Sequence, residues 1–152
     1  MDLKELKVKL YETCLEHINQ RITVAKQAMN TAQSAANEEG KSSAGDKYET
    51  GRAMMQIERD KNAAQLAEAL KIKKILEQFP PAKTLEKAEA GALLQTDSGL
   101  FYLCVSAGKI SAEGQNAFAV SPVTPFGQAC SGKKANECFS VNGKAFKILE
   151  IA

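Results

Sequence analysis

An uninterrupted apolar repeat at the start of this chain constrains its fold more than any other feature. No proline or glycine precedes Gly40, and apolar side chains recur in alternating steps of three and four residues. A repeat sustained over about four heptads predicts one helix with a narrow apolar stripe, roughly 50 Å long at about 1.5 Å per residue. The predicted stripe consists of Val8, Tyr11, Leu15, Ile18, Ile22, Ala25, Met29, Ala32 and Ala36.

A second helical pattern runs from about Thr50 to Gln78, where Phe79-Pro80-Pro81 stops it. Its apolar residues form two adjoining lines instead of one stripe. One line holds Ala53, Ile57, Ala64 and Ala67, and the other holds Met55, Leu66, Ala69 and Leu76. Two long helices with a short link are expected to fold back as an antiparallel coiled-coil hairpin, in which each helix covers the stripe of the other.

The composition changes after the two prolines. The segment "PPAKTLEKAEAG" is typical of a linker, and no long periodic helix follows Gly91. Two later segments, "ALLQTDSGLFYLCV" and "CFSVNGKAFKILEI", each predict a β-hairpin. The second prediction is the stronger one, because Asn142-Gly143 suits a type I′ turn between alternating strands.

Between the two hairpins, "VTPFGQACSGK" predicts one short helix. Thr124 is its expected N-cap, Pro125 its first helical residue and Gly132 its C-terminal cap. The whole sequence therefore predicts an α+β protein. We expect the coiled-coil hairpin over residues 1–79 with its tip near residues 40–50, a linker over 80–90, and a small β-rich domain over 91–152.

The overall composition excludes several classes of protein. Among its 152 residues, 44% are hydrophobic and 25% charged, as is ordinary for a globular protein. A net charge of +2 argues against nucleic-acid binding over the whole surface. The N-terminus is charged from the start and no segment approaches the roughly 18 apolar residues of a membrane span, so we expect a cytoplasmic protein without a signal peptide.

The four cysteines include no Cys-x-x-Cys pair, and reduced thiols are expected. Cys14 and His17 have the spacing of two zinc ligands, but no second pair accompanies them, and a histidine on the helix surface is the favoured interpretation. Cys130 and Cys138 flank a turn and are expected to behave as small apolar residues.

The tip carries two carboxylates three residues apart, Asp46 and Glu49, within "SSAGDKYETG". One interpretation is structural: the pair has the spacing of a capping box that begins the second helix. The other is chemical, because two carboxylates about one helical turn apart suit Mg²⁺, which keeps most of its waters. Such an ion would be held well only when another molecule supplied further ligands. Both interpretations stay open, and one turn can serve both.

Three segments together resemble the bacterial Gre transcript-cleavage factors, in the same order and over nearly the whole chain. At the tip, that family has Gly-Asp, two residues, then Glu, and this chain has Gly45-Asp46, two residues, then Glu49. "VSPVTPFGQACSGK" is similar to the family's Ser-Pro helix that ends in Gly-Lys, with Thr124-Pro125 in the Ser-Pro place. "VNGKAFKILEIA" is similar to its final hairpin.

The resemblance implies an FKBP-like fold for the C-terminal domain and RNA polymerase as the partner. Family members insert the coiled coil through the secondary channel, where the tip acids help the polymerase hold a second Mg²⁺ and a water that hydrolyses a backtracked transcript. Asp46 and Glu49 would be these acids, and the contact with the RNA 3′ end would be indirect. Thr124, Pro125, Phe126 and Lys133 would belong to the docking surface. The protein would be a stimulating factor, not an enzyme, with no small-molecule substrate.

Two other functions stay open. This chain has Thr50-Gly51-Arg52-Ala53 after the second acid, where the family usually continues Asn-Ala-Glu-Tyr. Because the chain departs from the family at the tip, a second hypothesis is that it occupies the polymerase channel as a regulator, even an inhibitory one, without stimulating cleavage. In the third hypothesis the chain is a coiled-coil interaction protein unrelated to polymerase, and its acid pair only caps a helix.

Overall fold

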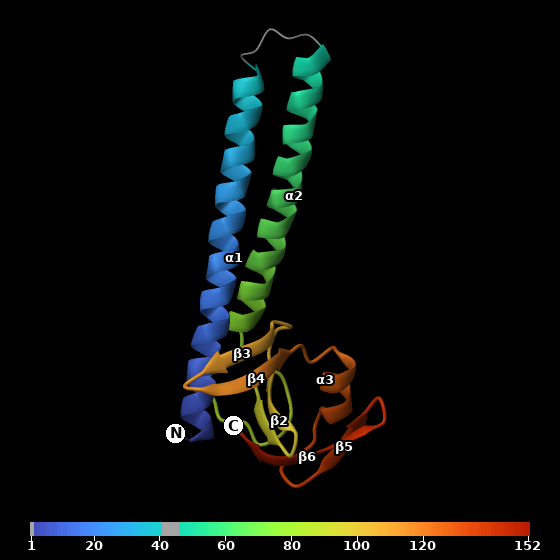
Figure 1. Ribbon diagram of the computed structural model, residues 1–152. Coiled ribbons are helices and arrows are strands. Elements are labelled where there is room, and N and C mark those ends of the chain that lie inside the picture. The colour runs from blue at the N-terminus through green and yellow to red at the C-terminus, as the bar shows by residue number, and fades with distance from the viewer. Residues whose placement is uncertain (1, 41–45) are drawn as a thin grey trace. The chain divides into compact units, whose positions relative to one another are not determined.

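A computed structural model describes residues 2–40 and 46–152, with the backbone alone for residues 36, 38–40 and 46–49 (Figure 1). Two long helices are followed by a mixed sheet and one short helix, which is the α+β arrangement expected from the sequence. The elements are α1 (Leu3–Gly40), α2 (Asp46–Glu77), β1 (Leu93–Thr96), β2 (Gly99–Leu103), β3 (Gly108–Ala112), β4 (Gln115–Val120), α3 (Pro125–Cys130), β5 (Cys138–Val141) and β6 (Lys144–Ile151). No helix in the described part of the chain is long and apolar enough to cross a membrane.

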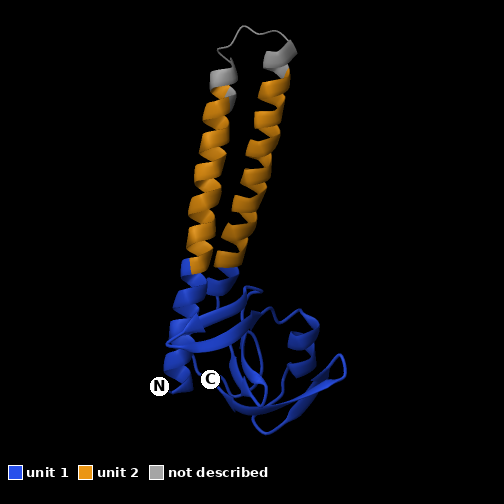
Figure 2. Cartoon of the chain, viewed as in Figure 1, with its two compact units in different colours: residues 1–16, 74–152 blue, residues 17–73 orange. Residues whose placement is uncertain are grey.

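The chain forms two compact units, coloured separately in Figure 2. The helical unit is residues 17–73, and the mixed unit is residues 1–16 with 74–152. The first turns of α1 and the last turn of α2 therefore belong with the sheet. By comparison, the hairpin predicted from the sequence spans residues 1–79 and the predicted β domain spans 91–152.

Within the helical unit, α1 and α2 pack through one row of apolar side chains. Ile18 and Ile22 of α1 are buried against Ala69 of α2, with Leu66 and Ile72 beside them. The predicted stripe on α1 is confirmed from Ile18 to Ala32, since its members there are buried or half-buried: Ile18, Ile22, Ala25, Met29 and Ala32. The side chain of Ala36, the last predicted member, lies outside the described residues.

The two apolar lines predicted on α2 have opposite outcomes. Met55, Leu66, Ala69 and Leu76 are half-buried or buried, so that line is confirmed as the inner face. The line of Ala53, Ile57, Ala64 and Ala67 is exposed, and its assignment to the interface was wrong. The physical reason is that a single facing helix covers only one narrow stripe, so the second line of α2 stays in solvent.

The first four turns of α1 bury a different line from the predicted one. Val8, Tyr11 and Leu15 are only half-buried, whereas the buried side chains are Leu3, Leu6, Lys7, Leu10 and Cys14. These turns belong to the mixed unit, where they contact a sheet. A sheet covers a broader and differently oriented face of a helix than a second helix does, and the buried line shifts accordingly.

The six strands form one mixed sheet in the order β3-β4-β2-β1-β6-β5. Both predicted hairpins are confirmed, as β1 with β2 and β5 with β6. Asn142 and Gly143 take φ values of 51° and 82°, as a type I′ turn requires. A third hairpin, β3 with β4, was not predicted, and β4 also pairs in parallel with β2.

The sheet is covered on both faces. Side chains alternate between these faces along each strand. On one face, Phe101 and Leu103 of β2 pack in the core that includes α3. Phe101, Phe126, Phe139 and Phe146 contact one another there, with the rings of Phe101 and Phe126 centred 4.3 Å apart. The alternate residues of β2, Leu100 and Tyr102, face the opposite side, where the first turns of α1 lie.

Candidate functional site

The two acids of the tip lie in the first turn of α2. Helix α1 ends at Gly40 and α2 begins at Asp46, so the backbone of Asp46 and Glu49 is helical at the start of the second helix. Their side chains lie outside the described residues. The capping-box and Mg²⁺ interpretations both therefore stay predictions.

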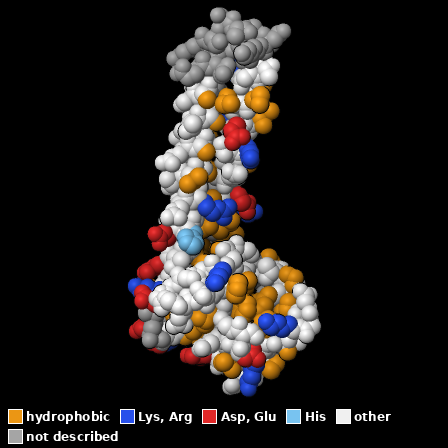
Figure 3. All heavy atoms as spheres, in the orientation of Figure 1, with side chains coloured by type: hydrophobic (Ala, Val, Ile, Leu, Met, Phe, Trp, Pro, Cys, Tyr) orange, Lys and Arg blue, Asp and Glu red, His pale blue; other side chains and the backbone are white. Residues whose placement is uncertain are grey.

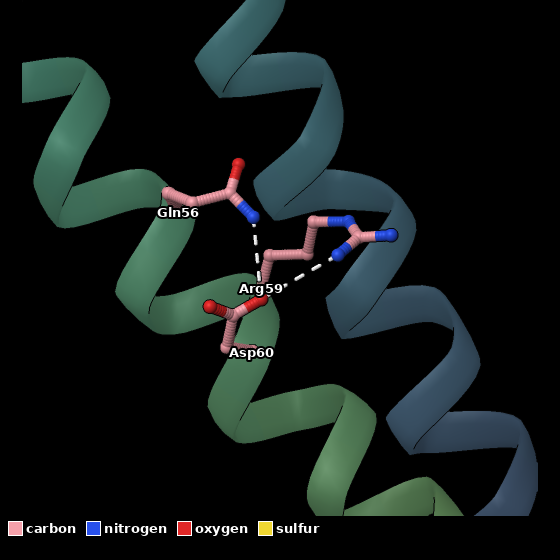
Figure 4. Close-up of polar contacts among 3 residues, drawn as sticks. All are labelled: Gln56, Arg59 and Asp60. Carbon is pink, nitrogen blue, oxygen red and sulfur yellow. Dashed lines mark hydrogen bonds and ion pairs between the residues drawn. The ribbon is translucent and has the colours of Figure 1, made fainter.

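Farther along α2, Gln56 and Arg59 both contact the carboxylate of Asp60 (Figure 4). Gln56 Nε2 donates to Asp60 Oδ1 over 3.2 Å, and Arg59 Nη1 lies 3.5 Å from the same oxygen. The Arg59 side chain points from α2 toward α1 in this view. An exposed pair of this kind contributes less than about 1 kcal/mol to stability. The Asp60 carboxylate already has two partners on its own helix.

The described side chains contain no group of three or more His, Cys, Asp or Glu residues that could hold a metal ion. His17 is exposed whereas Cys14 is buried, and no further ligand accompanies them among the described side chains. The two carboxylates of Asp46 and Glu49 are chemically suited to an ion that keeps most of its waters and takes its other ligands from a partner. A cation bound at the tip would accordingly depend on that partner.

The helical unit exposes large apolar side chains outside its buried row. Val24 on α1 is 64% exposed, and Met54 and Ile57 on α2 are 60% and 68% exposed. A groove of about 610 Å³ is lined by His17, Gln20, Arg21, Val24, Ala25 and Gln65. In the space-filling view, hydrophobic and charged side chains alternate along this unit (Figure 3). Both helices therefore expose polar and apolar side chains.

Helix α3 begins at a well-formed cap. The Thr124 hydroxyl accepts a hydrogen bond from the Gly127 N–H over 3.2 Å and donates to the Ser121 carbonyl over 2.7 Å. Pro125 follows in the first turn, where a missing N–H costs nothing. These observations confirm the predicted start of the helix. At its other end the C-cap is Ser131, and Gly132 follows with a φ of 77°, the left-handed conformation that glycine favours there.

The four residues predicted to dock a partner differ in what they expose. The Phe126 ring packs among three other phenylalanines and Thr124 is half-buried as the cap, so both hold α3 in place. Pro125 is exposed at the start of α3. Lys133 is half-buried, and its backbone carbonyl accepts from Ala88 N over 2.7 Å. Binding by these residues stays a prediction.

The mixed unit contains a buried lysine that was not predicted from the sequence. Lys7 is 1% exposed, and its Nζ donates to the Lys83 carbonyl over 2.8 Å. Burial lowers the pKa of Lys7, and the nearby charge of Lys83 lowers it further. A cavity of about 380 Å³ lies beside it, with Phe79, Pro80 and Leu85 among its walls. The spacing of Leu3, Leu6, Leu10 and Cys14 was the available signal that this face of α1 is covered.

No family model, no curated protein and no solved structure matches this chain. The assignment of a function therefore depends on the residues of the chain itself and on the elements that carry them.

Proposed function

We propose that this protein binds RNA polymerase at its secondary channel and stimulates cleavage of backtracked transcripts through Asp46 and Glu49. The observation that carries the proposal is the position of the two acids. They lie in the first turn of α2, directly after the connection between two long helices. The proposal also depends on the resemblance of the tip and of the C-terminal segments to the Gre factors.

The length of the helical unit supports a role in which the acids reach into a partner. From His17 to Gly40, helix α1 extends about 36 Å at 1.5 Å per residue. Only two helices have to pass through the channel. Because their shared apolar row is narrow, most of their surface is free to contact its walls.

The chemical contribution of the tip would be electrostatic. Two carboxylates add negative charge where the polymerase already has ligands of its own, and such an arrangement favours a divalent cation. When bound, the cation would lower the pKa of a coordinated water and so supply the nucleophile for phosphodiester hydrolysis. Asp46 and Glu49 would help hold the ion, and the catalytic centre would remain that of the polymerase.

The mixed unit would provide the docking surface. Pro125 and the neighbouring Val123 are exposed at the start of α3, and Val123 is 76% exposed. Behind them, the Thr124 cap and the packed Phe126 ring hold this segment in one conformation. An apolar contact point on a rigid support is a common basis of protein–protein binding.

The test is RNA cleavage in a stalled, backtracked elongation complex of the cognate polymerase at fixed Mg²⁺. Wild-type protein is compared with the double variant Asp46→Asn/Glu49→Gln. The matched control is Glu58→Gln/Glu68→Gln, which removes two exposed carboxylates from α2 away from the tip. We expect wild type and control to stimulate cleavage equally, and the tip variant to lose at least about tenfold in rate, as losses of charge-stabilising groups do.

Three outcomes separate the hypotheses. If wild type does not stimulate cleavage but displaces a known channel-binding factor, the protein is a channel-occupying regulator. If the tip variant stimulates cleavage as well as wild type does, the two acids serve only to stabilise the start of α2. If wild type neither stimulates cleavage nor binds the polymerase, the hairpin serves an unrelated partner and the proposal is refuted.

A further inference from the structure

The cavity beside Lys7 lies within the mixed unit, and no function proposed above uses it. Its lining consists of Lys7 of α1 and of residues from the segment between Gln78 and Gly91. That segment connects the end of α2 to the sheet. With a volume of about 380 Å³, the cavity falls within the range of roughly 300–1,000 Å³ that is usual for small-molecule sites. Its size therefore suits a small molecule.

Lys7 brings a buried positive charge to this cavity without a negative partner. Its side chain is 1% exposed, and its Nζ donates one hydrogen bond, to the Lys83 carbonyl over 2.8 Å. An ammonium has three N–H groups, so two donors are left without an acceptor in the described part of the chain. Among the described residues, no carboxylate forms an ion pair with Lys7. A buried charge in this position is costly unless an opposite charge joins it.

The other charges at the cavity do not neutralise Lys7. Glu89 is the one carboxylate among the described residues that line it. Its Oε2 lies 3.9 Å from Lys87 Nζ, so this carboxylate already has a cation beside it. Lys83 adds a second positive charge to the lining, and this charge, after burial itself, lowers the pKa of Lys7. The lining therefore carries a net positive charge, which favours an anion.

The cavity also has an apolar wall, formed by Phe79, Pro80 and Leu85. Leu85 is 8% exposed and belongs to the core that includes α3. Phe79 packs closely on Gly91, since a Cβ placed there would lie 3.1 Å from the Phe79 Cβ. The Gly91 N–H in turn donates to the Leu103 carbonyl over 2.6 Å. A wall held by the core and by β2 is preformed, which lowers the entropic cost of binding.

We propose that this cavity binds a small carboxylic acid, with its carboxylate on the Lys7 ammonium and its apolar body on Phe79, Pro80 and Leu85. The carboxylate would accept the N–H groups that the Lys83 carbonyl leaves unused, in charge-assisted hydrogen bonds. One buried ammonium suits a singly charged carboxylate better than a phosphate, which has more oxygens to satisfy. The proposal does not depend on whether the protein binds polymerase.

The test titrates the full chain with four acids of increasing apolar size: acetate, benzoate, cinnamate and octanoate. Backbone amide NMR follows the titrations, because it gives both the dissociation constant and the residues whose signals shift. The amide of the tightest-binding acid is its neutral match, and inorganic phosphate tests whether any anion binds.

Three variants accompany the wild type. Lys7→Met removes the ammonium and keeps an unbranched apolar side chain of similar length, so we expect it to stay folded. Lys4→Met is the matched control, because Lys4 is an exposed lysine of the same helix. Glu89→Gln removes the negative charge of the lining.

We expect the larger acids to shift amide signals of residues 78–91 and to bind wild type and Lys4→Met equally. Acetate should bind more weakly, because it leaves the apolar wall uncovered. Lys7→Met, and replacement of the acid by its amide, should each weaken binding at least about tenfold, as the loss of a hydrogen bond to a charged group does. Glu89→Gln should strengthen binding about twofold, because it removes a repulsion that solvent partly screens.

Three results would overturn the proposal. The first is that none of the four acids shifts signals of residues 78–91 at millimolar concentration. The second is that folded Lys7→Met binds the tightest acid as well as wild type does, since Lys7 would then not hold the carboxylate. The third is that the neutral amide or inorganic phosphate binds as tightly as the acid, which would mean that the cavity does not select a carboxylate with an apolar body.

Discussion

The helical unit and the mixed unit differ in how their buried side chains are supplied. In residues 17–73, one row from each helix meets one row from the other, around Ile18, Ile22 and Ala69. In the mixed unit, a sheet is covered on both faces by segments from opposite ends of the chain. A single row gives each residue few neighbours, whereas a two-faced sheet gives its central residues contacts on several sides. Truncating a buried side chain should therefore lower the free energy of unfolding more in the mixed unit than in the helical unit.

The largest effect is expected from Phe146→Ala in the mixed unit. Phe146 is 7% exposed, and its ring contacts those of Phe101, Phe126 and Phe139. Its truncation should lower the free energy of unfolding by about 4 kcal/mol, measured by urea denaturation. The control is Phe118→Ala, because Phe118 is 48% exposed and should cost less than about 1 kcal/mol. Equal losses for the two variants would contradict the proposed core.

Gly127→Ala should have the next largest effect. A Cβ at Gly127 would lie 2.5 Å from the Pro122 carbonyl oxygen, and that neighbour is backbone that cannot rotate away. We expect a loss of about 2–3 kcal/mol in urea denaturation, because α3 must shift from its place on the sheet. Gly132→Ala is the matched control. A Cβ added at Gly132 would have no neighbour within 4 Å, although the φ of this residue is 77°. The substitution should therefore cost only about 1 kcal/mol. A smaller loss at Gly127 than at Gly132 would show that α3 moves freely.

Ile22→Ala tests the single row of the helical unit. Ile22 is 7% exposed, and its truncation should lower stability by about 2 kcal/mol, the low end for such changes because the row is thin. Hydrogen exchange followed by mass spectrometry should show faster exchange in peptides from residues 17–73. Ile57→Ala is the control: its side chain is 68% exposed, and alanine favours helix, so stability should change by less than about 0.5 kcal/mol. A larger loss of stability for Ile57→Ala than for Ile22→Ala would mean that the line of α2 containing Ile57 does lie in an interface.

Most secondary structure of this chain was predictable because its signals are local. The heptad spacing indicated α1, a less regular helical pattern indicated α2, Asn142-Gly143 indicated the last hairpin, and Thr124-Pro125 indicated the start of α3. Each signal depends on residues only a few positions apart. The start of the second helix was less well predicted, because its apolar pattern indicated a start near Thr50, whereas α2 begins at Asp46.

What could not be predicted depends on contacts between distant segments. The parallel pairing of β2 with β4 joins strands separated by another strand, and no local spacing specifies it. Similarly, Leu10 and Cys14 are buried because the first turns of α1 cover a sheet, a partner absent from the helix's own pattern. An amphipathic helix indicates that some face is covered, but the covering element decides which line of residues is buried. The role proposed for Asp46 and Glu49 would likewise depend on a partner outside the chain, which no local spacing specifies.

The smallest effect concerns Lys7, whose buried ammonium is the feature of the mixed unit least expected from the sequence. Its substitution by methionine removes one hydrogen bond to Lys83 and one buried charge, and these two changes oppose each other. At neutral pH we therefore expect stability within about 1 kcal/mol of wild type in urea denaturation.

The pH dependence of that difference is the sharper measurement. Burial lowers the pKa of Lys7 in the folded protein below its ordinary value of 10.5, so the folded state opposes protonation and the charged form costs stability. This cost is present below the folded pKa and is relieved as the pH rises toward the unfolded pKa. Wild type should thus gain stability relative to Lys7→Met between neutral pH and about pH 10. Lys4→Met, which removes an exposed lysine from the same helix, should show no such trend. A constant difference between wild type and Lys7→Met would mean that the Lys7 ammonium is as well solvated in the folded protein as in water.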